Sequence, residues 1–411
     1  MKKFLLGTTA LISLSAASAA MAGGSHAPAA AAPANTGGLT VMVGGSLNFQ
    51  SAFINQDEDA ALGNANESDM VFTNDTRINV TAAGSTEDFD YGAVVSLFAD
   101  TGADRDARIA TAPTQFGAGD KAYIYVENDS FGRVEGGANV SASDSMEVDA
   151  SRVARATGGV DGDATYYITP GGTTAATTSG LSTWRTRSNL DLGGDASNAA
   201  IANKLTYYTP RFSGFQLGVS FTPDTGNIGT TNSLSLDNDA GQFENVFAGG
   251  ISFEGDVSDG VTLMASAVGE TGSSQVSTVN DLSEYSLGLG LEFEGFSVAG
   301  NYSDLGDSGL ATAATVNTDS SLWSIGAGYE NGPYGVSVTY LDATSGTGVA
   351  QGAAVGGENE FTNLVVGADY QMAPGLTPYI EAAFFDAEAG ATNATEQNSG
   401  EVILVGANLA F

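Results

Sequence analysis

The sequence predicts an all-β fold, a transmembrane antiparallel β-barrel of 16 strands with short periplasmic turns and long extracellular loops. Three observations lead to this prediction. From Leu39 to Phe411 apolar residues alternate with small or polar ones, the period of strands with two different faces. The connections between these segments are alternately very short and long. No apolar run of about 18 residues follows the extreme N-terminus, which argues against membrane-spanning helices.

The N-terminal residues are expected to be an address and a spacer. Met1-Lys2-Lys3 is positively charged, and an uncharged, mainly apolar stretch follows to Ala17. Small-x-small cleavage candidates end at Ala20 and Ala22, the pattern of a secretory signal peptide over residues 1–22. Residues 23–38 are rich in Ala and Pro without an apolar period, which predicts a flexible leader. We therefore place the barrel domain at 39–411.

The alternation is clearest in the second half of the chain. In 285–294 and in 215–222, large apolar residues occupy every second position, with Gly, Ser, Gln, Thr or Glu between them. The segment 363–370 follows the same pattern except at Val365, which is apolar on the polar face. Sixteen segments of this kind can be counted. They begin near Leu39, Met70, Phe89, Lys121, Phe131, Asn203, Phe215, Asn245, Val261, Tyr285, Phe296, Leu322, Tyr334, Phe361, Leu376 and Glu401.

The lengths of the connections distinguish a membrane barrel from a soluble sandwich. Short links rich in Gly, Pro, Asn or Asp read as tight hairpins. They lie at 87–88, 128–129, 212–214, 256–259, 295, 331–333 and 373–375. Long, polar and acidic stretches such as 56–69, 271–281 and 342–360 lie between them. Strict alternation of short and long connections is the layout of an outer-membrane barrel, and a soluble sandwich has no reason to segregate its loops in this way.

Closure and width then predict a pore. An open sheet edge in hydrocarbon would leave backbone N–H and C=O groups unpaired, so the sheet must close. A barrel of this size is too wide for side chains to fill, and its interior holds water. We expect the apolar set of each strand to contact lipid and the small, polar and charged set to line the lumen.

The final strand and the aromatic residues support this orientation. Ile403, Val405, Ala407, Leu409 and Phe411 share one face, and a terminal Phe in this phase is typical of outer-membrane barrels, whose assembly machinery recognises it. Aromatic residues gather near the short turns, where amphipathic rings favour the membrane interface. The expected periplasmic girdle comprises Phe89, Tyr91, Phe131, Tyr207, Tyr208, Phe212, Phe215, Phe296 and Tyr334.

Composition excludes several classes of function. The chain has 13 Lys and Arg against 48 Asp and Glu, and a net charge of −35 opposes binding to nucleic acid. There is no Cys, and the single His, His26, lies in the leader, so neither a thiol nor a Ser-His site can form in the folded part. No phosphate-binding Gly-Lys loop is present. An enzyme is therefore disfavoured and no cofactor is expected.

Acidic runs are the one hint of a metal. Gln56–Asp59 and Asp161–Asp163 offer hard oxygen ligands suited to Ca²⁺ or Mg²⁺. Neither run has a complete binding-loop pattern.

Three local motifs resemble those of the Gram-negative general porins. Residues 130–137 (SFGRVEGG) resemble the family's fifth strand, and 203–218 (NKLTYYTPRFSGFQLG) resemble its sixth and seventh. Phe411 is the third motif, and the resemblance covers Leu39 to Phe411. It implies a homotrimeric diffusion channel of the outer membrane, whose partners are lipid, other copies of itself, the assembly machinery and small hydrophilic solutes.

The resemblance also implies a constriction. In the family, the third long loop folds into the barrel and its acidic residues face basic residues of the wall. Here the corresponding connection is 141–202, longer than is usual in the family. We expect the loop anions to be Asp144, Glu147 and Asp149, and the wall cations to be Arg77, Lys121 and Arg133. The loop also contains Arg152, Arg155, Arg185 and Arg187, which could replace or supplement the wall cations.

Charge asymmetry suggests what passes through the pore. No Lys or Arg follows Arg211, whereas Glu292, Asp369 and Glu381 fall in lumen phase. Negative walls raise the local concentration of cations, so the hypothesis is a weakly cation-selective, otherwise non-specific pore.

Two alternatives stay open. A substrate-selective channel on the same barrel would show an aromatic or basic track along the lumen. An exported surface β-protein, such as an adhesin or an envelope-layer subunit, would lack single-channel activity and heat-modifiable migration in gels.

Overall fold

A computed structural model of the chain describes residues 34–36, 38–57, 68–99, 118–168, 201–226, 242–312, 319–346, 358–388 and 397–411. Within these residues the fold is a single antiparallel sheet with a few short helices. Its strands are β1 (Ala34–Thr36), β2 (Leu39–Gln56), β3 (Met70–Ser85), β4 (Asp90–Phe98), β5 (Ala118–Asn128), β6 (Gly132–Ala138), β7 (Asn203–Tyr208), β8 (Phe215–Asp224), β9 (Phe243–Ser258), β10 (Val261–Ser274), β11 (Leu282–Phe293), β12 (Phe296–Gly306), β13 (Ser320–Asn331), β14 (Tyr334–Gly346), β15 (Glu358–Tyr370), β16 (Leu376–Glu388) and β17 (Asn398–Ala410).

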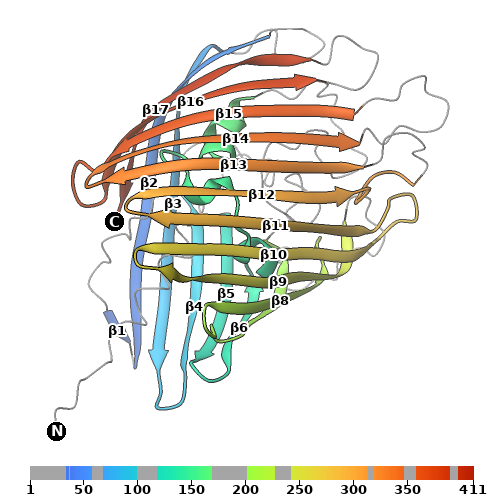
Figure 1. Ribbon diagram of the computed structural model, residues 1–411. Helices are drawn as coiled ribbons and strands as arrows, with labels where there is room; N and C mark the ends of the chain where they lie inside the picture. Colours follow the sequence, from blue (N-terminus) through green and yellow to red (C-terminus); the bar gives the residue numbers. More distant parts are fainter. Residues whose placement is uncertain are drawn as a thin grey trace.

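Strands β2 to β17 close into a barrel (Figure 1). Each strand pairs with its neighbour in the chain, and β17 pairs with β2 in continuous register from Gly400↔Gln56 to Ala410↔Ser46. The predicted class is thereby confirmed, including the count of 16 barrel strands. The short β1, in the predicted leader, pairs with the start of β2. Residues 1–22 lie outside the described residues, so the signal peptide stays a prediction.

Each predicted hairpin turn joins two paired strands. The links β11–β12 and β13–β14 are two-residue turns with a glycine at positive φ, Gly295 (84°) and Gly332 (60°). Glycine suits these positions because it adopts this region without a steric penalty. Short turns lie at one end of the barrel and the long connections leave from the other (Figure 1).

Several strands extend further than the sequence pattern suggested. β10 continues to Ser274 and β14 to Gly346, both inside stretches predicted as loop. The register pairs Asp342 with Thr362 and Thr344 with Glu360, so the ladder persists among polar residues. Backbone pairing does not depend on side-chain polarity, and a strand that rises beyond the apolar band keeps its hydrogen bonds while losing the alternation that reveals it.

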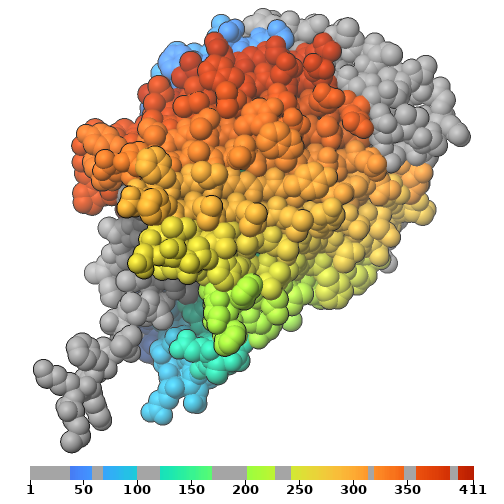
Figure 2. Space-filling view, viewed as in Figure 1, coloured from blue at the N-terminus to red at the C-terminus, as the bar shows by residue number. Residues whose placement is uncertain are grey.

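The outer face of the barrel is apolar. Leu289 is 65% exposed and Ile124 66%, whereas their inward neighbours Gly290 and Tyr125 are buried. Figure 2 shows the outer face of β9 to β16, yellow to red, as a continuous surface. No helix among the described residues is long and apolar enough to cross a membrane.

The two ends of the barrel chain meet at a closing seam. The Phe411 N–H donates to the Gly45 carbonyl (3.0 Å), and the Gly45 N–H donates to the Phe411 carbonyl (2.9 Å). Gly45 suits this position because a Cβ there would crowd the Phe411 ring (3.1 Å) and overlap the backbone of Arg77. The terminal residue is thus part of the ladder that closes the sheet.

Candidate constriction site

The third long connection folds against the inside of the barrel. Its described part contains α1 (Ala142–Met146) and the 3-10 helices η2 (Ala150–Val153), η3 (Gly159–Asp161) and η4 (Asp163–Tyr167). α1 packs on β7 to β10, η2 on β12 to β14, η3 on β14 to β16, and η4 on β16, β17 and β2. In Figure 1 this green segment lies behind β11 to β15. The predicted fold of the loop into the lumen is therefore confirmed for residues 141–168.

Hydroxyl groups of the wall hold the loop backbone. Backbone N–H groups of Ala142, Val148 and Ala150 donate to the Oγ atoms of Ser220 (2.8 Å), Ser266 (2.9 Å) and Ser324 (3.1 Å), respectively. Further along, Arg155 donates to Ser337 Oγ (2.8 Å) and Val160 to Thr339 Oγ1 (3.0 Å). These N–H groups belong to short helices and turns, and each finds on the wall the acceptor that its own segment does not supply. The inward Ser and Thr residues of the strand pattern thus act as anchor points.

Inward glycines make room for the same segment. A Cβ at Gly288 would overlap the Val148 carbonyl oxygen, and one at Gly328 would lie 2.6 Å from the Val153 oxygen. At Gly326 the nearest atoms would be Val153 Cγ2 (2.8 Å) and the Ala150 oxygen (2.9 Å). Glycine at lumen phase therefore marks the path along which the loop approaches the wall.

Two buried wall carboxylates clamp the middle of the loop. Asp369 on β15 accepts two hydrogen bonds from the Arg155 guanidinium, from Nε (2.8 Å) and Nη2 (2.8 Å). Glu381 on β16, fully buried, accepts from the N–H groups of Thr157 (3.1 Å) and Gly159 (3.4 Å) and from the Thr157 hydroxyl. Glu330 also contacts Arg155. Two of the three predicted lumen acids, Asp369 and Glu381, thus lie inside the barrel and bind the loop.

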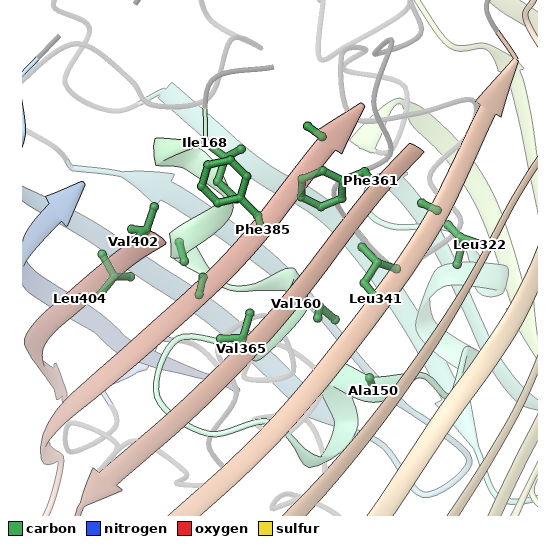
Figure 3. Packing of buried hydrophobic residues seen from close by; sticks show 14 of the residues in the cluster. Ala150, Val160, Ile168, Leu322, Leu341, Phe361, Val365, Phe385, Val402 and Leu404 are labelled. Atoms are coloured by element: carbon green, nitrogen blue, oxygen red, sulfur yellow. The ribbon is translucent and has the colours of Figure 1, made fainter. Parts of the chain in front are cut away.

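The inner wall is not uniformly polar, and the expectation that it would be is wrong for β13 to β17. Leu341, Val365 and Leu404 point inward and are buried. Figure 3 shows Val160 of the loop beside Val365 and Leu341, and Ile168 beside Phe385. This small apolar core forms because the loop covers these strands and removes them from water. Val365, the exception in the alternation, is explained by this contact.

The predicted wall cations lie on β3, β5 and β6, outside the set of strands on which the loop helices pack. Arg77 is in the middle of β3, Lys121 near the loop end of β5, and Arg133 next to the short turn at the start of β6. Arg77 is in inward phase because Thr73 Oγ1 on the same strand contacts Tyr167 of the loop (2.7 Å). Lys121 and Arg133 are in inward phase because Ile124 on β5 and Val134 on β6 point outward. Arg77 stacks over the Phe98 ring at 4.9 Å.

Arg133 is embedded in acidic and aromatic neighbours. Its guanidinium donates to Glu135 Oε1 (2.5 Å) and Glu127 Oε2 (2.7 Å), and it lies 4.1 Å from the centre of the Tyr125 ring. Asn139 donates to the second Glu135 oxygen (2.7 Å). One cation thus faces two carboxylates.

Tyr208 links this cluster to the loop. It is the cross-strand partner of Arg133, and its ring packs against the buried cluster that includes Met146 of α1. Tyr208 therefore neighbours the predicted wall cation Arg133 and lies on the strand that contacts α1, the helix that carries the predicted loop anion Asp144. Assignment of Tyr208 to the interfacial girdle is wrong, because its neighbour Tyr207 faces outward and successive strand residues point to opposite faces.

The other predicted loop acids are turned away from open solvent. Glu147 and Asp149 are each 4% exposed. Glu147 accepts a hydrogen bond from Asn301 on the wall (3.0 Å), and Asp149 caps η2 by accepting from the N–H of Ser151 (3.2 Å). Asp144, in α1, is partly exposed.

The remaining candidates lie apart from this cluster. Glu292 is in inward phase but sits at the short-turn end of β11, exposed. Asp163 accepts from Asn48 Nδ2 (3.0 Å), and residues 58–67, which include part of the first acidic run, lie outside the described residues. Over the described ranges no three Asp, Glu, His or Cys side chains gather as a metal site would require.

In the sequence, Arg155 is only one of four additional arginines of the loop. Its partners, Asp369 and Glu330, are separated from it by 214 and 175 positions in the chain. One feature of the sequence could have indicated this pair. Asp369 is in lumen phase and has no basic residue near it in the sequence, so a cation from a distant segment is needed to balance its charge. Arg185 and Arg187 lie outside the described residues.

A closed transmembrane barrel whose lumen is narrowed by an inward-folded loop defines a channel. The model of the Gram-negative porin family matches residues 7–390, and the chain belongs to this family. It is an outer-membrane porin.

Curated relatives and solved structures are similar to the chain at low identity. An uncharacterized protein of Rickettsia felis is 25% identical over 474 residues, covering 100% of both chains. One from Rickettsia conorii is also 25% identical, over 70% of this chain and 75% of that one. Among solved structures, an anion-selective porin from Comamonas acidovorans has a TM-score of 0.57 at 17% identity, covering 91% of this chain and 100% of that one. A triple mutant of Rhodopseudomonas blastica porin has a TM-score of 0.51 at 18% identity, covering 90% and 100%. These two structures support the fold.

Proposed function

We propose that this porin is a homotrimeric, weakly cation-selective channel for passive diffusion of ions and small hydrophilic solutes. The observation that carries the selectivity is the charge inside the barrel. Arg133 faces Glu127 and Glu135, and Arg155 faces Asp369 and Glu330, so each cluster has one cation and two carboxylates. Negative lumen walls enrich cations over anions.

Reversal potential in a KCl gradient tests this selectivity. We expect the mature protein, refolded and inserted into planar bilayers, to give single-channel steps and a potential of the sign that K⁺ preference produces. The preference should weaken in high salt, since the Debye length falls to about 3 Å at 1 M. A Cl⁻ preference would contradict the proposal.

Of the two alternative functions, the structure provides evidence on the substrate-selective channel. The rings of Phe98, Tyr123 and Tyr125 point inward, as some rings of the aromatic track of such a channel would. However, Arg77 covers Phe98 and Arg133 covers Tyr125, which is only 4% exposed. These two rings already have cationic partners on their faces, which favours the non-specific channel.

Removal of Phe411 tests the proposal that the C-terminal strand directs assembly. We expect deletion of this residue to lower sharply the amount of heat-modifiable protein in the outer membrane, because both seam hydrogen bonds and the terminal recognition residue are lost. Phe293→Ala, which removes another half-exposed outer aromatic residue, is the control. Equal assembly of the deletion variant and the control would contradict the role of Phe411.

The molecular mass of the extracted protein tests whether it is a trimer. Protein extracted in mild detergent should have the mass of three chains by light scattering corrected for detergent, and should dissociate on heating. A stable monomer that still conducts would refute the trimer while leaving the channel intact.

A further inference from the structure

Arg152 is exposed on the lumen side of the third loop. In η2 the residues Ala150 and Val153 face the wall, where Ala150 donates to Ser324 and Val153 lies against Gly326. Side chains three apart in a 3-10 helix share one side. Both of these residues are buried against the barrel, so Arg152 points away from it, toward the open lumen.

Backbone carbonyls fix the Arg152 guanidinium in place. Nε and Nη2 both donate to the Glu147 carbonyl (3.1 and 3.0 Å), and Nη2 also reaches the Ser145 carbonyl (3.4 Å). These hydrogen bonds use the Nε–Nη2 edge of the planar guanidinium, and none of them involves Nη1. The side chain is therefore held in one orientation although it is exposed.

The positive charge of Arg152 is not neutralised by these contacts, because both acceptors are neutral backbone carbonyls. Across the described residues, no carboxylate lies within salt-bridge distance of Arg152, whereas Arg133 and Arg155 each have two. The adjacent acids Glu147 and Asp149 are buried and bonded to Asn301 and Ser151. The loop thus exposes a cation to the lumen, beside the predicted loop anions Glu147 and Asp149, which are buried.

We propose that Arg152 is a specificity-determining residue of the channel, an anion-binding site that receives carboxylate or phosphate groups of passing solutes through Nη1. A fixed, planar guanidinium with free donors matches the geometry of these groups. The site admits anionic solutes to a lumen that otherwise favours cations and keeps the cation preference weak. This inference rests on the proposed diffusion channel.

Two measurements on Arg152→Gln test the site. The first is the K⁺/Cl⁻ permeability ratio from reversal potentials, which should rise about threefold when one nearby charge is removed. The second is reduction of KCl current by added citrate, a tricarboxylate probe, which should need several-fold more citrate in the variant. Arg152→Glu should raise the ratio further, and Arg152→Lys should keep it near that of the unmodified protein while weakening the citrate effect, since Lys lacks the planar fork.

Arg211→Gln is the matched control. Arg211 is also exposed and donates to a backbone carbonyl, that of Gly214 (3.0 Å), but it lies at a short turn and pairs with Glu254 (3.6 Å). Its removal should change neither measurement appreciably, and all variants should show the same heat-modifiable gel migration.

The outcomes separate the two proposals. If Arg152→Gln conducts with an unchanged ratio and unchanged citrate sensitivity, the role of Arg152 is wrong and the channel stands. If Arg152→Lys matches Arg152→Gln in its ratio, charge at this position does not set selectivity and the proposal is overturned. If the unmodified protein forms no conducting pores, the diffusion channel itself fails, whatever residue 152 is.

Discussion

Replacing Asp369 and Glu381 together by alanine is expected to release the third loop from the wall and to destabilise the barrel. Arg155, whose side chain is only 7% exposed, would lose its bidentate partner, and breaking a buried pair by removing one member costs about 3–5 kcal/mol. The N–H groups of Thr157 and Gly159 would lose their acceptor, which adds about 1–3 kcal/mol for each group left buried and unpaired. The free energy of unfolding should fall by several kcal/mol, and single-channel conductance should become larger and noisier.

Urea unfolding of the refolded protein in detergent, followed by intrinsic fluorescence, measures the first effect, and planar-bilayer recording measures the second. Glu330→Ala is the matched control, because it removes a carboxylate partner of the same arginine that is 48% exposed. Exposed ion pairs contribute about 0–1 kcal/mol, so this variant should unfold nearly normally. Its conductance should be neither larger nor noisier than that of the unmodified protein, although loss of the Glu330 charge should lower the cation preference. A double variant indistinguishable from this control would mean that the two carboxylates do not hold the loop.

Gly288→Ala is expected to have the second-largest effect, although it adds a single methyl group. The new Cβ would overlap the Val148 carbonyl oxygen, so the loop backbone must move away from β11. That movement breaks the hydrogen bond from the Val148 N–H to Ser266 (2.9 Å). Overpacking of a close contact typically costs about 1–3 kcal/mol.

The measurement is the shift in urea midpoint, with conductance as a second readout of loop position. Gly136→Ala is the control: it lies in β6 at negative φ, and the nearest atom to its added Cβ would be Leu205 Cδ1 at 4.0 Å. We expect Gly136→Ala to unfold at the unmodified midpoint or slightly above it. Equal stability of Gly288→Ala and Gly136→Ala would show that the loop does not pack closely on β11.

The positions of strands and turns could be predicted because their causes are local. Alternation in 285–294 and glycine at positions such as Gly332 depend on neighbours in sequence, through the pleat of a strand and the sign of φ in a turn. The same alternation placed Arg77, Lys121 and Arg133 on the inner face. The alternation is ambiguous where two adjacent residues are of the same kind. At Tyr207 and Tyr208 it led to the wrong assignment of Tyr208 to the outer face.

The details of the constriction were not predictable in this way. Glu147 and Asp149 carry the expected charge, but their burial depends on contacts with a wall strand and with the loop's own turn. The clamp of Arg155 and Asp369 joins residues 214 positions apart, and no local pattern records such a pair. Apolar residues on the inner face, such as Leu341, are favourable only because the loop lies over them.

The amino-acid order by itself determined a closed, lipid-facing β-barrel, because period-two alternation and turn chemistry act between neighbours. Only the tertiary structure decided which charges meet inside it: the loop buries Glu147 against the wall and Asp149 in its own turn, joins Arg155 to distant carboxylates and leaves Arg152 facing the lumen. The physical reason is that Coulomb and hydrogen-bond energies depend on distances in space, and the path of a long loop sets those distances.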